Sequence, residues 1–120
     1  MKKILLLNFI VLILFVGCKD IIRNANNGNF KLINKSDKVV EFVWIAPEGE
    51  FFPTAKNIDI NHDKSYESEG LSAGKYDIAI DFKGEFNSFN SKKDKSLCLY
   101  IEKGLTTTWY IDQYGNIIRN

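Results

Sequence analysis

Beyond residue 28, apolar and polar residues alternate in short stretches, and turn-forming residues separate these stretches. The clearest example covers residues 76–82, where Tyr76, Ile78, Ile80 and Phe82 alternate with Asp77, Ala79 and Asp81. A period of two is typical of a β-strand with one face in the core and the other in water. We therefore predict a strand here, with Asp77 and Asp81 on its solvent side.

Strands are also predicted over residues 30–33, 39–45, 58–60, 65–69, 97–101, 105–111 and 117–118, from alternation, from β propensity and from the turns between them. Residues 39–45 are rich in β-branched and aromatic side chains, which fits a strand covered on both faces. Residues 46–55, with two prolines and a glycine, and the polar residues 83–95 are expected to be loops. No stretch here shows helical spacing over three turns. The predicted fold class is all-β: an antiparallel β-sandwich of about seven or eight short strands, Ig-like or transthyretin-like.

The first residues have the layout of an export signal. Met1-Lys2-Lys3 is cationic, and residues 4–16 are apolar except for Asn8. A charged start, an apolar stretch of about 7–15 residues and a small residue form the pattern of a secretory signal peptide. The apolar stretch is shorter than the roughly 20 residues that a membrane-spanning helix needs. We therefore predict that residues 1–17 are removed after export.

Residues 14–18, Leu-Phe-Val-Gly-Cys, resemble the lipobox of bacterial lipoproteins. In that family the signal peptide is cleaved before the cysteine, and the cysteine thiol carries a diacylglycerol. Phe15 departs from the usual leucine. The resemblance implies that Cys18 is the lipid attachment site and that the covalent lipid holds the protein at a membrane, since two or more acyl chains anchor stably. An ordinary signal peptide with a chance cysteine, or a short uncleaved anchor, are the alternatives.

This resemblance implies three parts: a signal peptide (1–17), a lipidated N-terminus with a flexible tether (18–28) and a β-sandwich domain (29–120). It also implies a place in the cell envelope. In lipoproteins of two-membraned bacteria, an aspartate directly after the cysteine retains the protein at the inner membrane. Lys19 occupies that place here, which favours the outer membrane.

The charge balance argues against nucleic acid as a partner. The chain has 16 basic and 15 acidic residues, and loss of Lys2 and Lys3 with the signal leaves 14 basic residues. Phosphate binding needs concentrated positive charge. The richest basic cluster, residues 92–95, has three lysines around an aspartate, and we interpret it as a solvated loop tip.

Cys98 is the second of two cysteines, and it lies in an apolar stretch. Free cysteine behaves as a small buried hydrophobe, so we expect an inert thiol in a strand. Pairing between two chains is the alternative for an odd cysteine in an exported protein.

Residues 70–80, Gly-Leu-Ser-Ala-Gly-Lys-Tyr-Asp-Ile-Ala-Ile, resemble the loop-to-strand element of transthyretin-like and carboxypeptidase-regulatory-like sandwiches. In that element a leucine enters the core, a glycine turns the chain and a tyrosine begins a strand. The resemblance covers eleven residues. It implies sandwich topology and carries no information on a ligand.

The side chains that catalysis requires are few. His62 is the only histidine and lies in a hydrophilic turn, whereas nucleophilic catalysis needs a base beside the nucleophile. One histidine and one available thiol are too few for a zinc site. Asp77 and Asp81 would stand about 13 Å apart along a strand, too far for the paired carboxylates of glycosidases.

Calcium needs only oxygen ligands, and several carboxylates and amides surround the turn at residues 59–67. The register of an EF-hand loop is absent, so we interpret these groups as solvated. The sequence therefore predicts a protein that is not an enzyme and has neither a metal nor another cofactor.

Aromatic residues in the expected loops remain as candidates for binding another protein: Phe51, Phe52, Phe86, Phe89 and Tyr114. Aromatic side chains are favoured at protein interfaces, although each phenylalanine could instead cap the core. The leading hypothesis is a non-catalytic, lipid-anchored module that contacts another envelope or external protein through its loops. A structural accessory subunit of an envelope or secretion complex is the alternative, and a metal-dependent or enzymatic module is the least favoured.

Overall fold

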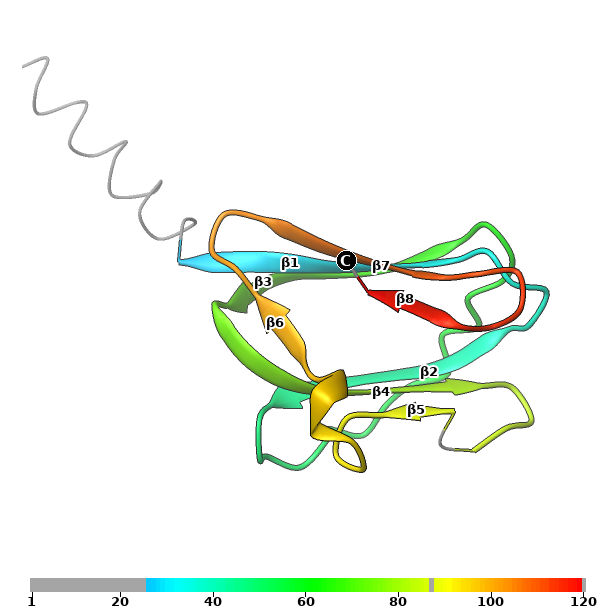
Figure 1. Cartoon of the computed structure of the whole chain (residues 1–120), viewed down its shortest axis with the longest axis horizontal. Coiled ribbons are helices and arrows are strands. Elements are labelled where there is room, and N and C mark those ends of the chain that lie inside the picture. Colours follow the sequence, from blue (N-terminus) through cyan, green and yellow to red (C-terminus); the bar gives the residue numbers. More distant parts are fainter. Residues whose placement is uncertain (1–25, 87, 120) are drawn as a thin grey trace, which may run out of the picture.

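The chain folds into two packed β-sheets, as the computed structural model shows for residues 26–86 and 88–119 (Figure 1). The strands are β1 (Asn27–Asn34), β2 (Val40–Pro47), β3 (Ser65–Ser72), β4 (Gly74–Phe82), β5 (Phe89–Asn90), β6 (Leu99–Ile101), β7 (Thr106–Ile111) and β8 (Ile117–Arg119), with a 3₁₀ turn, η1, at Lys95–Leu97. The predicted all-β sandwich is confirmed. The signal peptide and the lipid site at Cys18 lie outside the described residues.

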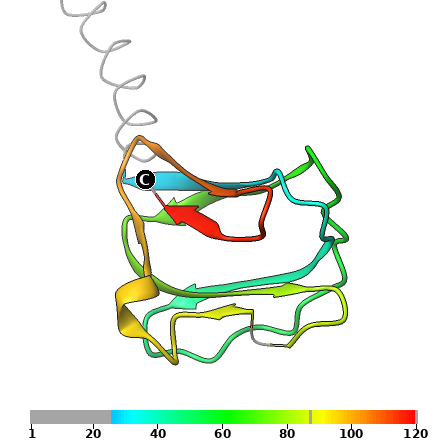
Figure 2. The same cartoon turned by 45° about the vertical axis from the view of Figure 1, so that its right-hand side comes forward.

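One sheet has the strand order β3-β1-β7-β8, and the other has β2-β4-β5 with β6 also paired to β4. The view in Figure 2 shows the two sheets as separate layers, with β6 and η1 at one side. The prediction of a wholly antiparallel sandwich is wrong at one place, because β1 and β7 pair in parallel, with Asn29 opposite Thr106 and Asn34 opposite Ile111. Their pairing joins segments more than 70 positions apart, which local alternation does not reveal.

The two ends of the sandwich differ in what they carry. At one end β1 begins, β4 begins beside Ser72, and β2 finishes with Pro47 opposite Tyr76. We call this the proximal end, because β1, the first strand, begins there. The distal end carries the turns after β1, β4 and β7 (Figure 1).

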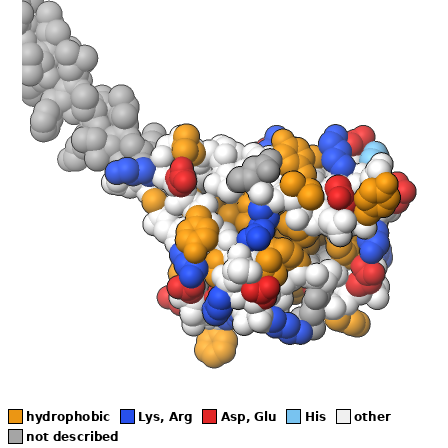
Figure 3. All heavy atoms as spheres, in the orientation of Figure 1, with side chains coloured by type: hydrophobic (Ala, Val, Ile, Leu, Met, Phe, Trp, Pro, Cys, Tyr) orange, Lys and Arg blue, Asp and Glu red, His pale blue; other side chains and the backbone are white. Residues whose placement is uncertain are grey.

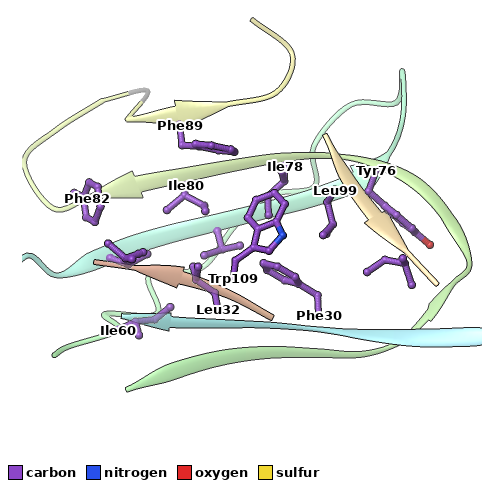
Figure 4. Packing of buried hydrophobic residues seen from close by; sticks show 14 residues of the cluster. Phe30, Leu32, Ile60, Tyr76, Ile78, Ile80, Phe82, Phe89, Leu99 and Trp109 are labelled. Carbon is purple, nitrogen blue, oxygen red and sulfur yellow. The ribbon is translucent and has the colours of Figure 1, made fainter. Parts of the chain in front are cut away.

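Trp109 of β7 lies at the centre of the core between the two sheets (Figure 4). Its ring meets Phe30 of β1 edge-on at a centroid distance of 5.3 Å and Phe89 of β5 at 5.7 Å. Aromatic pairs of this geometry stabilise beyond the area that they bury. The three rings therefore link β1 and β7 in one sheet to β5 in the other.

Strand β4 departs from the predicted amphipathic pattern. Asp77 is fully buried and Ala79 nearly so, although both lie on the face that the alternation assigns to water. The loop after β2 and the segment that follows β5 cover this face: Gly49 N–H donates to Asp77 Oδ2, and Ser91 Oγ donates to Asp77 Oδ1. The middle of β4 is therefore covered on both faces. Asp77 is buried there, whereas Asp81 is partly exposed.

Four local predictions also differ from the structure. Residues 58–60 form no strand, and Ile60 makes a single bridge to Val40. The expected turn at residues 70–74 is narrower, because β3 continues to Ser72. The expected loop at residues 83–95 contains the two-residue strand β5, and β1 begins at Asn27, within the predicted tether.

Tyr76 supports the predicted local geometry of the segment after β3. Its hydroxyl donates a 2.6 Å hydrogen bond to Ser72 O, four residues earlier, while the ring is buried. Leu71 packs against the core, and Gly74 takes a φ of 148°, which few other residues adopt. The resemblance of this segment to the transthyretin-like family stays a prediction.

Candidate interaction site

The most exposed aromatic residue among those described is Phe51, in the loop of residues 48–53 that follows β2. We call this segment the Phe51 loop. Pro47 ends β2, and Gly49 takes a φ of 85°, so the chain turns back across the outer side of β4. There Gly49 N–H donates a 3.0 Å hydrogen bond to Asp77 Oδ2. A buried carboxylate thus fixes one side of an exposed loop.

Lys92 fixes the other side of the Phe51 loop. Its ammonium group donates a hydrogen bond to Glu50 O and lies 4.7 Å from the ring centre of Phe52 and 5.6 Å from that of Phe51. Lysine and an aromatic face attract each other at this range, by about 0.5–1 kcal/mol where exposed. The predicted loop tip at residues 92–95 therefore has a second role, because it holds an aromatic loop in place.

Phe52 connects this loop to a row of rings on the outer face of β2. Its ring lies 6.5 Å from Trp44, and Trp44 stacks on Phe42 at 5.1 Å. These three side chains are partly buried, whereas Phe51 is 96% exposed. The sequence prediction did not include Phe42 and Trp44, because a continuous apolar strand gives no sign of which of its two faces a loop will cover.

Phe86 and Tyr114 lie together at the distal end. They line a shallow groove of about 340 Å³ with Phe82 at its base, and they are 89% and 75% exposed. A salt bridge of 3.3 Å between Lys38 and Glu85 spans the same groove. The structure therefore divides the predicted aromatic residues into two groups, one at each end of the sandwich.

Phe89 belongs to neither group. It is 9% exposed, pairs opposite Ile80 in β5 and contacts Trp109. Of the two alternatives given for Phe89, its burial favours a place in the core over contact with a partner protein. A two-residue strand within a polar segment is too short to give a readable alternation.

A buried polar cluster lies beneath the Phe51 loop, around Asp77. The Asp77 Oδ1 atom accepts hydrogen bonds from Ser91 Oγ at 3.0 Å, Lys95 Nζ at 3.4 Å and Cys98 Sγ at 3.6 Å. Burial favours a raised pKa for this carboxyl, but the hydrogen bonds from Gly49, Ser91 and Lys95 outweigh it and hold the pKa below its ordinary value. Asp77 therefore stays charged and satisfied, which suits a structural role.

Cys98 is buried as predicted and is not activated. Burial raises the pKa of its thiol, and the neighbouring carboxylate of Asp77 acts in the same direction. A nucleophilic cysteine instead needs positive charge beside it and a lowered pKa. Lys75, whose positive charge lowers the pKa of this thiol, is paired with Glu48 at 2.7 Å.

The remaining chemical candidates lie apart from one another. His62 contacts Ser36 O and Asp63 in the distal turn, more than half of its side chain is exposed, and Asp63 also binds Lys35. Within residues 26–86 and 88–119, no group of three or more His, Cys, Asp or Glu side chains is arranged to hold a metal ion. The same residues include no helix long and apolar enough to span a bilayer.

No protein-family model, curated protein or solved structure matches this chain. A function for the protein therefore has to be inferred from its own sequence and geometry.

Proposed function

We propose that this chain is a lipid-anchored envelope protein whose β-sandwich binds another envelope protein through the Phe51 loop. The observation that carries the proposal is the fixed position of Phe51: a nearly fully exposed phenylalanine on a loop that Asp77 and Lys92 both hold. A side chain that is already ordered loses little entropy on binding. An exposed aromatic beside a cation is also a typical centre of a protein interface.

The anchor is supported by the lipobox-like sequence of residues 14–18. If the lipid is on Cys18, seven residues lie between it and Asn26, and the eight steps from one Cα to the next span at most about 28 Å of extended chain. The Phe51 loop lies near the proximal end, because β2 finishes there. This position favours a partner in the same envelope over a distant external one.

The test is photocrosslinking in the cells that make the protein. A photoreactive phenylalanine analogue at position 51 should capture one or a few defined envelope proteins, and the same analogue at position 118 should not. Ile118 is a matched control because it is also an exposed apolar residue, 42% exposed, but on the outer side of β8. Equal capture from both positions would show nonspecific contact and contradict the proposal.

The variant Phe51→Ala separates binding from folding. Because the ring is exposed, removing it should leave the unfolding midpoint unchanged and abolish the crosslinked or co-purified partner. Phe86→Ala should retain the partner, since Phe86 lies at the other end. Loss of the partner only with Phe86→Ala would move the site to the distal groove, and recovery in one large membrane complex would favour the accessory-subunit hypothesis.

The lipid is tested independently by mass spectrometry of the native protein. The expected product begins at Cys18 and carries acyl chains, and Cys18→Ser should release the protein from the membrane fraction. A native protein that retains residues 1–17, or that has an unmodified Cys18, would contradict the anchor and leave the protein–protein interaction to be judged by the crosslinking.

A further inference from the structure

A shallow groove at the distal end combines exposed rings with hydrogen-bonding side chains, and the function proposed above does not use it. Its volume is about 340 Å³, and it is lined by the exposed rings of Phe86 and Tyr114, with the buried Phe82 at its base. We call it the distal groove. Figure 3, in the orientation of Figure 1, shows hydrophobic, basic and acidic side chains beside one another at the distal end, on the right of the view. A groove of this volume suits a small ligand or one unit of a larger one.

The position of Tyr114 is fixed by Asp112. Asp112 Oδ1 accepts hydrogen bonds of 2.9 Å from Tyr114 N–H and from Asn116 N–H. The turn is closed by Asp112 N–H, which donates to Asn116 O, and by Gly115 N–H, which donates to Asp112 O. The backbone that carries Tyr114 and Asn116 is therefore ordered before a ligand binds, which reduces the entropy lost on binding.

Phe86, the other exposed ring, lies in a turn that is bonded to β4. Glu85 N–H donates to Phe82 O at 3.0 Å, and Ser88 N–H donates to Asp81 Oδ1 at 3.3 Å. Phe82 N–H in turn donates to Ser88 Oγ at 3.4 Å. A hydroxyl group can accept and donate at the same time, so Ser88 can also donate to a ligand in the groove.

Lys38 and Glu85 supply a donor and an acceptor in the same groove. Lys38 Nζ lies 3.3 Å from Glu85 Oε1 and 5.2 Å from the ring centre of Phe82. Both charged side chains are about half exposed, and an ion pair with this exposure adds little to stability. Each group also has hydrogen-bonding positions left, since an ammonium group has three donors and a carboxylate accepts several bonds. Both can therefore bond to a ligand without a large loss elsewhere.

This combination favours one chemical class of ligand. A sugar hydroxyl both donates and accepts hydrogen bonds, so it can use a groove that offers Lys38, Glu85 and Asn116 together. The C–H groups on one side of a sugar ring form an apolar surface, and these weakly positive groups pack on the negative face of an aromatic ring. Because the charges of Lys38 and Glu85 balance, a neutral sugar is favoured over a charged one.

A proline-rich segment is the other ligand that grooves lined by aromatic residues accept. Such a segment has free carbonyl oxygens but few N–H groups. It would therefore bond to the donors of the distal groove and leave the Glu85 carboxylate unused. A ligand rich in hydroxyl groups matches the groove better.

We propose that the distal groove binds a neutral sugar residue of a glycan. The sugar ring packs on Phe86 and Tyr114. Its hydroxyl groups donate to Glu85 and accept from Lys38 and Asn116. The groove lies at the other end of the sandwich from the proposed protein interface, so either proposal can be disproved without the other.

The test is saturation-transfer NMR on the full chain in a detergent without sugar groups. The probes are the methyl glycosides of glucose, galactose, mannose, rhamnose, fucose, N-acetylglucosamine and N-acetylgalactosamine. We expect saturable transfer to at least one of them. Phe86→Ala and Tyr114→Ala should each weaken that binding about tenfold. Glu85→Gln should weaken it several-fold, because a charged acceptor becomes neutral.

Two variants serve as matched controls. Phe51→Ala removes a similarly exposed ring at the other end, and Glu67→Gln removes a half-exposed carboxylate that pairs with Lys31. Both should leave the Kd for the sugar unchanged. Because Phe86 and Tyr114 are exposed, their alanine variants should keep the unfolding midpoint of the unchanged chain.

Saturable binding that the two groove variants weaken, and the controls do not, supports the proposal. Absence of transfer to every glycoside, or equal effects of groove and control variants, overturns it. Tighter binding of methyl glucuronide than of methyl glucoside would contradict the neutral class. The peptide acetyl-hexaproline-amide tests the alternative: if it binds in the groove and no glycoside does, the ligand is a proline-rich segment and the sugar proposal is wrong.

Discussion

Asp77 Oδ2 and the backbone nitrogen of Gly49 are 3.0 Å apart, and this hydrogen bond joins a fully buried carboxylate to an exposed loop. Asp77 lies in β4, whose other face forms the core, so the position of the loop depends directly on the rigid part of the sandwich. Because Asp77 also accepts from Ser91 and Lys95, one side chain connects three segments that are far apart in the sequence.

Replacing Asp77 by Asn should destabilise the protein at neutral pH by about 2–3 kcal/mol, since an amide NH₂ group would replace an oxygen that accepts a hydrogen bond. The pKa of Asp77 is lowered in the folded state. Its contribution to the free energy of unfolding is therefore fully present above the pKa of an aspartate in the unfolded chain, near 4. This contribution is lost as the pH falls through the pKa of Asp77 in the folded protein. Urea unfolding followed by tryptophan fluorescence should show the difference between the two proteins shrink below about pH 4.

Asp81→Asn is the matched control for this experiment. Asp81 is partly exposed on the same strand and accepts one long hydrogen bond, 3.3 Å, from Ser88 N–H. Its replacement should cost less than about 1 kcal/mol. Equal effects of the two substitutions at neutral pH would contradict the structural role assigned to Asp77.

Phe89→Ala and Phe86→Ala should have opposite consequences although the two residues are three positions apart. Phe89 contacts Trp109 in the core, so its removal should cost about 3–5 kcal/mol. Phe86 is 89% exposed, and its removal should change the unfolding free energy by less than about 0.5 kcal/mol. Denaturant unfolding of the two variants measures both values, and a stable Phe89→Ala protein would contradict the core assignment.

Phe89 also shows what could not be predicted from this sequence. Alternation over residues 76–82 predicts β4, and the high β propensity of residues 105–111 predicts β7, because each strand is long enough for its residues to give a repeated signal. Phe89 lies in a two-residue strand among polar residues, and the burial of Asp77 depends on a loop that returns over the sheet. Both are tertiary effects, and neither has a local pattern.

For the candidate site residues as well, local sequence patterns predict some features, and others depend on tertiary contacts. The prolines and the glycine around Phe51 place it in an expected loop and make it a candidate for exposure, and in the structure it is 96% exposed. The sequence indicates only a solvated loop residue at Lys92, and its contacts with Phe51 and Phe52 depend on two loops about 40 residues apart.

Gly28→Ala should be among the most destabilising small substitutions in the domain. A Cβ atom at Gly28 would overlap Glu102 O and lie 2.8 Å from Ile101 Cγ2, where β1 crosses the turn between β6 and β7. Overpacking against backbone costs typically about 1–3 kcal/mol. Thermal or urea unfolding should show a loss at the upper part of this range.

Gly70→Ala is the comparison, because Gly70 has open space around it and a φ of 68°. This substitution should lower the free energy of unfolding only through the backbone strain of an alanine at positive φ, by about 1–2 kcal/mol. A smaller loss for Gly28→Ala than for Gly70→Ala would show that β1 does not lie as close to this turn as the structure has it.

Cys98 should react slowly in the native protein. Burial raises the pKa of its thiol, so at neutral pH both access and the thiolate fraction are low. In a full chain carrying Cys18→Ser, where Cys98 is the one remaining thiol, native labelling by a disulfide reagent should be at least about a hundredfold slower than labelling in guanidinium chloride. Asp77→Asn should accelerate the native reaction, because it loosens the segments that cover the thiol, whereas Asp81→Asn should not. Rapid labelling of the otherwise unchanged native chain would show that Cys98 is accessible and would contradict the closed packing of η1 against β4.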